Sequence, residues 1–250
     1  MLSADLSTAL LAAARADRLL VTTDFDGTVA PIVNNPSDAR ALAPAVAALN
    51  ALSTRPGTMV AVISGRALSV LDELARASGI TAQAELVGSH GAEFPDGFGQ
   101  PVDTALLAQI TRDLATIAAA YPGVTVETKP ASVALHVRRA SAADGETALA
   151  AARHANNEWR AEMTSGKAVL EFAVIDTDKG AAIDALRRQS GATVTLYFGD
   201  DVTDEKAFTR LGSADVGVKV GDGPTAAGYR VAGPEEVCEA LQVLAHARRS

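Results

Sequence analysis

Two aspartates stand one residue apart near the start of the chain. The apolar run RLLV is followed by TTDFDGT, so Asp24 and Asp26 lie where a buried strand is expected to end. Two carboxylates this close repel each other and raise each other's pKa unless a cation lies between them. A charged site at the strand end would account for this pair.

Polar residues also follow two other expected strands. Ligands of parallel α/β sheets bind at the carboxyl ends of the strands, so these residues are expected to meet at one edge. They are Ser64 and Arg66 at the end of the strand at 58–64, and Asp200, Asp201 and Asp204 in GDDVTDE at the end of the strand at 193–200.

Several carboxylates in one crevice imply a hard cation that prefers oxygen ligands. Magnesium fits, because it is usually held by one or two carboxylates together with waters and a substrate phosphate. Lys179, in DTDKGAA at an expected helix start, adds a positive charge suited to a phosphate.

Simpler interpretations exist for each piece. Asp-Gly is a common turn, and a single lysine such as Lys179 is more often on the surface than in a site. Asp204 and Glu205 could be favourable acids in the first turn of a helix. The order of the pieces, each at a strand end or a helix start, favours a site.

The elements that position these residues alternate between short β-branched runs and alanine-rich helical stretches. This alternation predicts a Rossmann-like, doubly wound parallel sheet of the α/β class. The expected strands are 19–24, 58–64, 85–89, 193–200 and 214–220.

The middle of the chain has a different pattern. Helical stretches at 103–120 and 142–158 alternate with strands at 124–128, 131–139 and near 160–172. The strands on either side of Pro130 form a hairpin more readily than a crossover. We expect an α+β domain at 103–175, inserted into a core formed by 1–102 and 176–250.

These strand-end motifs resemble those of the haloacid dehalogenase superfamily of phosphotransferases. The resemblance implies that Asp24 is the nucleophile that forms an aspartyl phosphate, and that Asp26 is the acid/base. It also implies that Mg²⁺ is bound by the Asp24 carboxylate, the Asp26 carbonyl and Asp200, with Asp201 and Asp204 in support. Ser64 and Lys179 would hold the phosphate oxygens. A second carboxyl at position 26 favours hydrolysis, since it can protonate a poor leaving group and then activate water.

Alternation along SVALHVRR places Ser132, Ala134, His136 and Arg138 on one face of a strand. Glu127 and Lys129 share a face, as do Lys167 and Glu171. On pattern alone, these charges could be exposed ion pairs across a half-buried sheet.

Longer stretches resemble the trehalose-6-phosphate phosphatase family. They are GSHGAE (88–93), ETKPASVALHVR (127–138), GKAVLE (166–171) and FGDDVTDEKAF (198–208). The resemblance implies that the inserted domain is a cap that recognises the sugar, and that the crevice of the core completes the site. The implied sugar contacts are Glu127, Lys129, Arg138, Lys167 and Glu171, and the implied crevice residues are Arg66, His90 and Gly91. Phe25 departs from the tyrosine of many relatives, which we expect to affect packing only.

Three functions remain open at this stage. The first is a magnesium-dependent phosphatase acting on trehalose 6-phosphate. The second is a phosphatase for another sugar phosphate, such as sucrose 6-phosphate, or a hexose phosphomutase. The third is a non-enzymatic, phosphorylatable sensor, although a receiver needs neither Asp26 nor a cap.

Composition argues against nucleic-acid-binding, disulfide-linked and membrane-spanning proteins. The formal charge is −8 with 48% hydrophobic residues, and no basic block indicates a nucleic-acid partner. A single cysteine, Cys238, cannot form an internal disulfide, and no apolar run reaches the ~18 residues that a membrane span needs. The N-terminus is unlike a signal peptide. We expect a cytoplasmic, stand-alone, monomeric enzyme without the synthase domain that is fused to some relatives.

Overall fold

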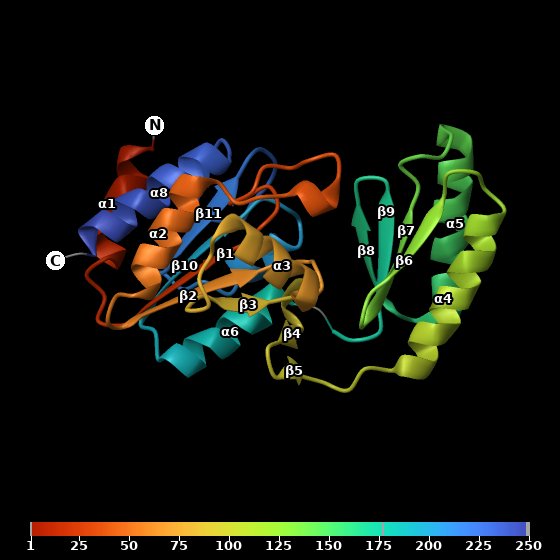
Figure 1. The fold of residues 1–250 in the computed structure, drawn as a ribbon, viewed down its shortest axis with the longest axis horizontal. Coiled ribbons are helices and arrows are strands. Elements are labelled where there is room, and N and C mark those ends of the chain that lie inside the picture. Colours follow the sequence, from red (N-terminus) through yellow and green to blue (C-terminus); the bar gives the residue numbers. More distant parts are fainter. Residues whose placement is uncertain (1, 177, 249–250) are drawn as a thin grey trace. The chain divides into compact units, whose positions relative to one another are not determined.

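The computed structural model describes residues 2–176 and 178–248, which form two compact units. Unit 1 comprises Met1–Gly97 and Asp178–Ser250, and unit 2 comprises Phe98–Thr177. Figure 1 shows that one segment of the chain supplies unit 2 while two segments supply unit 1. The sequence placed these boundaries at 103 and 175.

Unit 1 is built on a six-stranded sheet in the order β12-β11-β10-β1-β2-β3, and every neighbouring pair is parallel. The α/β class with a parallel sheet is therefore confirmed. The strands are β1 (Leu19–Thr23), β2 (Thr58–Ile63), β3 (Glu85–Val87), β10 (Val194–Gly199), β11 (Val216–Val220) and β12 (Tyr229–Val231).

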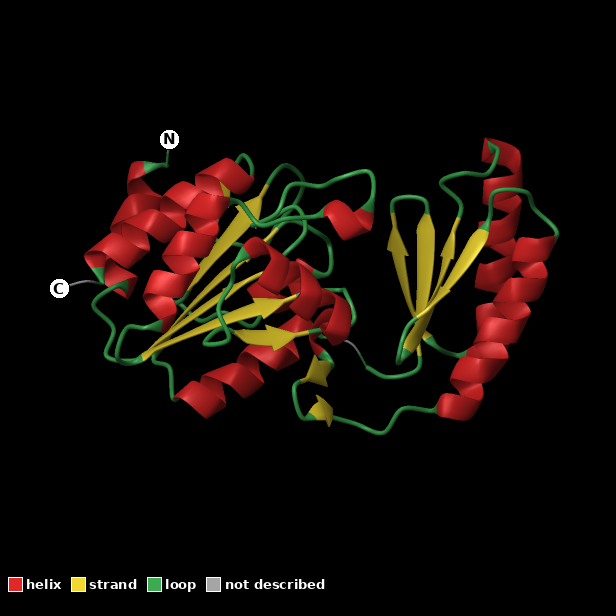
Figure 2. Ribbon diagram, in the orientation of Figure 1, coloured by secondary structure: helices red, strands yellow, loops and turns green. Residues whose placement is uncertain are grey.

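Helices cover both faces of this sheet (Figures 1 and 2). Alternation along β1 explains why, because Leu19 and Val21 enter one apolar cluster while Leu20 enters the other. The first cluster lies under α1 (Ala4–Ala13), α2 (Ala43–Ser53), α3 (Leu68–Ser78) and α8 (Pro234–Ala247), and the second under α6 (Lys179–Ser190) and α7 (Asp204–Phe208).

Short elements complete unit 1 and lead into unit 2. They are the 3₁₀ turns η1 (Pro36–Asp38) and η2 (Ser89–Gly91), and the two-residue strands β4 (Glu93–Phe94) and β5 (Gly97–Phe98). Among the described residues, no helix is both long enough and apolar enough to cross a membrane.

Unit 2 has a four-stranded antiparallel sheet in the order β6-β7-β9-β8, with α4 and α5 packed on one face. Trp159 at the end of α5 packs edge-on against Phe172, with ring centroids 5.2 Å apart. The elements are α4 (Thr104–Ala119), β6 (Thr125–Thr128), β7 (Ser132–His136), α5 (Ala142–Trp159), β8 (Glu162–Gly166) and β9 (Val169–Ala173).

Several details differ from the sequence-based expectations. The strand expected at 85–89 ends at Val87, before the 3₁₀ turn η2. The strand expected to reach 139 ends at His136, because Arg138 and Arg139 form an exposed turn after Val137. The edge strand β12 was missed, since its three residues follow a glycine-rich segment and carry no extended apolar pattern. The predicted hairpin around Pro130 is confirmed, because β6 and β7 pair antiparallel.

Candidate active site

The carboxyl ends of three neighbouring strands bring the acidic motifs together. β1 lies between β10 and β2, and Asp24, Ser64 and Asp200 each follow directly after one of these strands. The backbone N–H of Asp24 donates to the carbonyl of Phe198 at 2.8 Å, which extends the β1–β10 pairing by one residue. The stretches TTDFDGT and GDDVTDE, which contain these two motifs, therefore have a fixed mutual position.

Lys179 joins the two motifs from the start of α6. Its Nζ lies 2.8 Å from Oδ1 of Asp24 and 2.7 Å from Oδ1 of Asp204, and only 3% of the lysine side chain is exposed. Tyr197, on β10, donates its hydroxyl to the same Asp204 oxygen at 2.6 Å. The interpretation of Lys179 as a surface lysine is therefore wrong. Asp204 is not only an acid in the first turn of a helix, because it also binds Lys179 and Tyr197.

The electrostatics follow from burial and crowding. Burial raises the pKa of Asp24 well above its ordinary value, and the Asp204 and Asp200 carboxylates add to this effect. Burial by itself lowers the pKa of Lys179, but Asp204 and Asp24 outweigh it, so the value is raised. Lys179 likewise outweighs burial at Asp204, whose pKa is lowered. The lysine is therefore held charged between two acids.

Asp200 completes a group of carboxylates suited to a cation. Burial, followed by repulsion from Asp204, raises the pKa of Asp200 to about 6. Carboxylate oxygens of Asp24, Asp200 and Asp204 all lie within 4.8 Å of one another. The glycine of TTDFDGT permits this approach, because a Cβ on Gly27 would lie 2.0 Å from the Asp200 carboxylate.

This donor set fits a divalent cation with a preference for oxygen. One lysine among three close carboxylates leaves an excess of negative charge, and a cation would relieve the repulsion that raises the pKa of Asp200. Asp201, which was expected to support the site, is exposed, and its N–H donates to Oδ2 of Asp204 at 2.9 Å.

Asp26 is paired with Arg66. The guanidinium donates from Nε to Oδ2 at 2.6 Å and from Nη2 to Oδ1 at 2.7 Å, so both carboxylate oxygens are engaged. Parallel contacts of this kind define orientation as well as adding attraction. In this arrangement the partner of Arg66 is a protein carboxylate.

Ser64 and the residues 89–91 form the neighbouring wall. Ser64 is 1% exposed, its hydroxyl accepts the N–H of Arg66 at 3.2 Å, and its carbonyl accepts the N–H of His90 at 2.9 Å. Gly91 packs against the start of α6, where a Cβ would lie 2.7 Å from the carbonyl of Asp178. Ser64, His90 and Gly91 therefore belong to one connected wall.

In unit 2, three of the expected sugar contacts lie on the sheet face opposite its helices. Lys129 contacts Oε2 of Glu171 at 2.8 Å, and Ser132 donates to Oε1 of the same carboxylate at 2.6 Å. Glu127 lies 2.9 Å from Nε2 of His136, and this contact lowers the pKa of Glu127. These groups are thus oriented by protein partners.

The other two expected sugar contacts are exposed and lie in turns that follow strands. Lys167 stands in the turn between β8 and β9, and Arg138 follows β7, with both residues exposed. The end of β7 at His136 removes the strand alternation that placed Arg138 beside Ser132 and Ala134.

Sequence reasoning missed two polar groups at the site of unit 1. Tyr197, inside a buried strand, binds Asp204, and Lys219 of β11 donates to the carbonyl of Asp200 at 2.5 Å. The available signal was a hydroxyl or an ammonium within a strand that is otherwise apolar, since such buried groups need partners.

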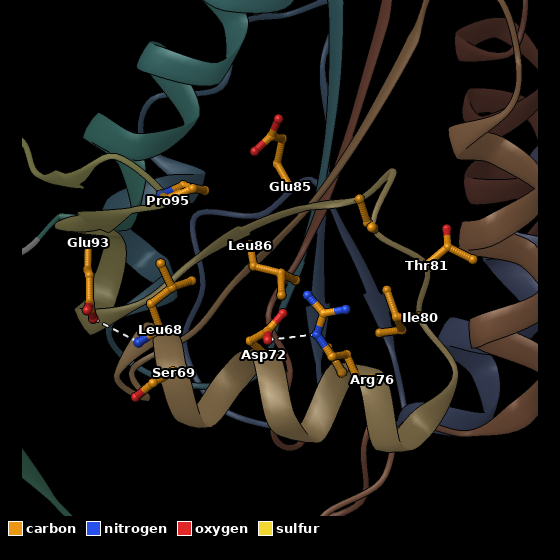
Figure 3. Close-up of a pocket in the computed structure, with 13 residues that line it drawn as sticks. Leu68, Ser69, Asp72, Arg76, Ile80, Thr81, Glu85, Leu86, Glu93 and Pro95 are labelled. Atoms are coloured by element: carbon orange, nitrogen blue, oxygen red, sulfur yellow. Dashed lines mark hydrogen bonds and ion pairs between the residues drawn. The ribbon is translucent and has the colours of Figure 1, made fainter.

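A separate pocket of about 620 Å³ lies between α3 and the edge strand β3 (Figure 3). Its lining includes Leu68, Asp72, Glu85 and Glu93, and does not include Asp24, Asp200 or Asp204. The pocket is therefore distinct from the carboxylate group.

Comparison with known proteins identifies relatives over most of the chain. The family model described as Trehalose-phosphatase matches residues 22–235. The chain is 38% identical to the trehalose-phosphate phosphatase of Mycolicibacterium paratuberculosis over 243 residues, covering 89% of this chain but only 61% of that protein. It is 34% identical to the trehalose-6-phosphate phosphatase of Escherichia coli K12 over 232 residues, covering 88% and 84% of the two chains.

Solved structures share the fold at lower sequence identity. The C-terminal domain of the C. albicans trehalose-6-phosphate phosphatase aligns with a TM-score of 0.81 at 22% identity, over 98% of this chain and 97% of that one. A haloacid dehalogenase-like hydrolase from Bacteroides thetaiotaomicron aligns with a TM-score of 0.68 at 14% identity, over 90% and 98%.

Proposed function

Because the chain belongs to the trehalose-phosphatase family, we propose that it hydrolyses trehalose 6-phosphate to trehalose and inorganic phosphate with the help of Mg²⁺. The observation that carries this proposal is the buried contact of Lys179 with both Asp24 and Asp204, beside Asp200. The proposed nucleophile, the cation site and the lysine that binds the phosphate then lie together at the carboxyl ends of the strands.

Asp24 is proposed as the nucleophile. One of its carboxylate oxygens forms a bond to phosphorus while the bond to the sugar oxygen breaks, which leaves an aspartyl phosphate and free trehalose. Water then attacks the phosphorus and releases the Asp24 carboxylate and phosphate. Lys179 and the Ser64 hydroxyl would hold the phosphate oxygens during both steps.

Asp26 is proposed as the acid/base. It would protonate the departing sugar oxygen, whose alkoxide is a poor leaving group, and later take a proton from the attacking water. Arg66 donates to both Asp26 oxygens, and release of this ion pair would free Asp26 for proton transfer. The arrival of a phosphate ester, which offers Arg66 another anion, is a suitable cause.

Asp24, Asp200 and the backbone carbonyl of Asp26 are the proposed ligands of Mg²⁺, and Asp201 and Asp204 are proposed to support them. When bound, the cation would neutralise charge that develops on the transferring phosphoryl group. Lys179 contributes a second positive charge from the protein.

Unit 2 is proposed as the cap that recognises the sugar. Charged groups suit a disaccharide, because each can bind adjacent hydroxyls through strong hydrogen bonds. The proposed sugar ligands are Glu127, Lys129, Arg138, Lys167 and Glu171, and in unit 1 Arg66, His90 and Gly91 are proposed to line the crevice. The cytoplasmic location and the monomeric state stay predictions.

A malachite-green assay of phosphate release tests this function across a panel of sugar phosphates, with and without Mg²⁺. We expect release from trehalose 6-phosphate that far exceeds release from sucrose 6-phosphate and hexose phosphates, and that disappears with EDTA. Preference for another ester would change the substrate, while isomerisation of a hexose phosphate would indicate a mutase. A stable phosphoprotein without turnover would indicate the sensor.

A further inference from the structure

Glu93 connects two segments that flank the proposed phosphate site. Its Oε2 accepts the backbone N–H of Leu68 at 2.8 Å and the hydroxyl of Ser89 at 2.9 Å. Figure 3 shows the first contact, with the carboxylate at the start of α3. The N-cap position of α3 is Ala67, which has no side-chain acceptor, so Glu93 supplies the missing cap from β4.

The segment between β2 and α3 carries Ser64, one of the two proposed phosphate ligands. It contains Ser64 and Arg66, and both of their carbonyls are also held by the turn at 89–91. Ser89 donates its N–H to the carbonyl of Arg66 at 2.7 Å, and His90 donates to that of Ser64 at 2.9 Å. The position of Ser64 therefore depends on how this turn is held.

The turn itself has an unfavourable backbone. Ser89 and His90 have φ angles of 50° and 54°, a conformation that non-glycine residues rarely adopt. Neighbours confine it on two sides, because a Cβ on Gly65 would lie 2.4 Å from the His90 ring and Gly91 packs against Asp178. A strained turn persists only where surrounding contacts hold it, and Glu93 holds the side chain at its first residue.

We propose that Glu93 is a positioning residue for phosphate binding, which acts by capping α3 and anchoring Ser89 so that Ser64 and Arg66 keep their places. The proposal rests on the proposed function only in assigning phosphate to Ser64. Without the carboxylate, the first turn of α3 loses its cap and the turn at 89–91 loses its side-chain anchor.

The test compares Glu93→Ala with two matched variants. Glu93→Gln keeps the shape and an acceptor oxygen, so it should restore most of the function. Ser3→Ala removes the hydroxyl that caps α1 in the same unit, where it accepts the N–H of Leu6 at 3.2 Å. Ser3→Ala thus reproduces the loss of a helix cap without touching the turn.

The main measurement is the Kd of inorganic phosphate by calorimetry in Mg²⁺ buffer, followed by KM and kcat for p-nitrophenyl phosphate. Glu93→Ala should weaken phosphate binding about 10- to 100-fold, as does loss of a residue that orients a ligand. Glu93→Gln should weaken phosphate binding by no more than about threefold, because it keeps an acceptor oxygen. A small loss remains, since a neutral acceptor forms a weaker hydrogen bond than a charged one. Both alanine variants should lower Tm by a few degrees.

A Glu93→Ala protein that melts early but binds phosphate like the wild type would overturn the proposal. If that variant does not fold, Ser89→Ala replaces it, because it removes the hydroxyl contact and leaves the cap of α3 in place. Unchanged phosphate binding in Ser89→Ala would overturn the proposed anchoring of the turn at 89–91. A wild-type protein that binds phosphate but hydrolyses no ester would refute the proposed function, while weakened binding in Glu93→Ala would still support this inference. A wild type that binds no phosphate would refute this inference alone, because the release assay tests the proposed function separately.

Discussion

Charged side chains gather in two regions that differ in burial. In unit 1, the Lys179, Asp24 and Asp204 side chains are 3%, 7% and 0% exposed. In unit 2, Lys129 and Glu171 are each 16% exposed. Glu127 there is 55% exposed. The same types of residue therefore experience strong electrostatic interactions in one unit and screened ones in the other.

This difference indicates different tolerance to substitution. A buried charge that loses its partner stays desolvated and uncompensated, whereas a half-exposed charge can turn to water. The network of unit 1 suits a reaction that needs charge in a fixed place. The face of unit 2 suits recognition, in which protein partners are exchanged for sugar hydroxyls.

Asp24→Asn should produce the largest effect. An amide cannot attack phosphorus, so phosphate release from trehalose 6-phosphate should fall by many orders of magnitude while circular dichroism shows a folded protein. Asp72→Asn is the matched control, since Asp72 is paired with Arg76 on the surface of α3 and should leave turnover unchanged. Retention of more than about a tenth of the activity in Asp24→Asn would eliminate the nucleophile assignment.

Asp26→Asn separates proton transfer from metal binding, because the backbone carbonyl survives and the proton donor does not. Turnover of trehalose 6-phosphate should fall by about 100- to 10,000-fold. The loss for p-nitrophenyl phosphate should be much smaller, since its phenolate leaves without a proton. Equal losses on both substrates, measured as kcat/KM, would indicate that Asp26 acts through geometry.

Lys179→Ala and Lys129→Ala compare the two regions directly. Removing Lys179 leaves two buried carboxylates without their cation, so the free energy of unfolding should fall by about 3–5 kcal/mol. Removing Lys129 breaks a pair whose two side chains are each 16% exposed. The loss should therefore lie between the ~1 kcal/mol of an exposed pair and the ~3 kcal/mol of a buried one. Urea denaturation in EDTA measures both values, and similar losses would contradict the distinction between the units.

Glu171→Ala tests recognition. If Glu171 binds a glucose unit, kcat/KM for trehalose 6-phosphate should fall by an amount equivalent to about 1–3 kcal/mol, while hydrolysis of p-nitrophenyl phosphate changes little. Glu146→Ala, at an exposed position of α5, is the control and should change neither. Equal losses on both substrates would favour the simpler interpretation of these charges as structural ion pairs.

His136→Ala should have the smallest effect. The contact with His136 holds the pKa of Glu127 below the ordinary value of 4.5. The ionised Glu127 therefore stabilises the fold above that pH, and this contribution is lost as the pH falls through the lowered pKa. In the variant, the Glu127 pKa measured by carbon-13 NMR should rise toward 4.5. An unchanged value would show that His136 does not orient Glu127.

Much of the fold was open to prediction from local patterns. Strands such as β1 and β10 are apolar because both faces of a parallel sheet are covered, and each ends where polar residues begin. The edge strand β12 was not predicted, because an edge strand can be short and needs no long apolar run. Asp24, Asp200 and Lys179 could be expected to lie close together because strand ends and helix starts locate them along the chain.

The sequence by itself therefore determined the class of the fold, the family and the strand ends that carry the motifs, since hydrophobic periodicity and motif spacing are local properties. Only the tertiary structure decided the partners. Asp26 meets Arg66, Tyr197 meets Asp204 and Glu93 caps α3 through contacts between 7 and 40 residues apart in the chain. Burial makes a hydrogen-bond partner obligatory for a polar group. Which residue supplies that partner depends on the direction of the side chains in the folded chain.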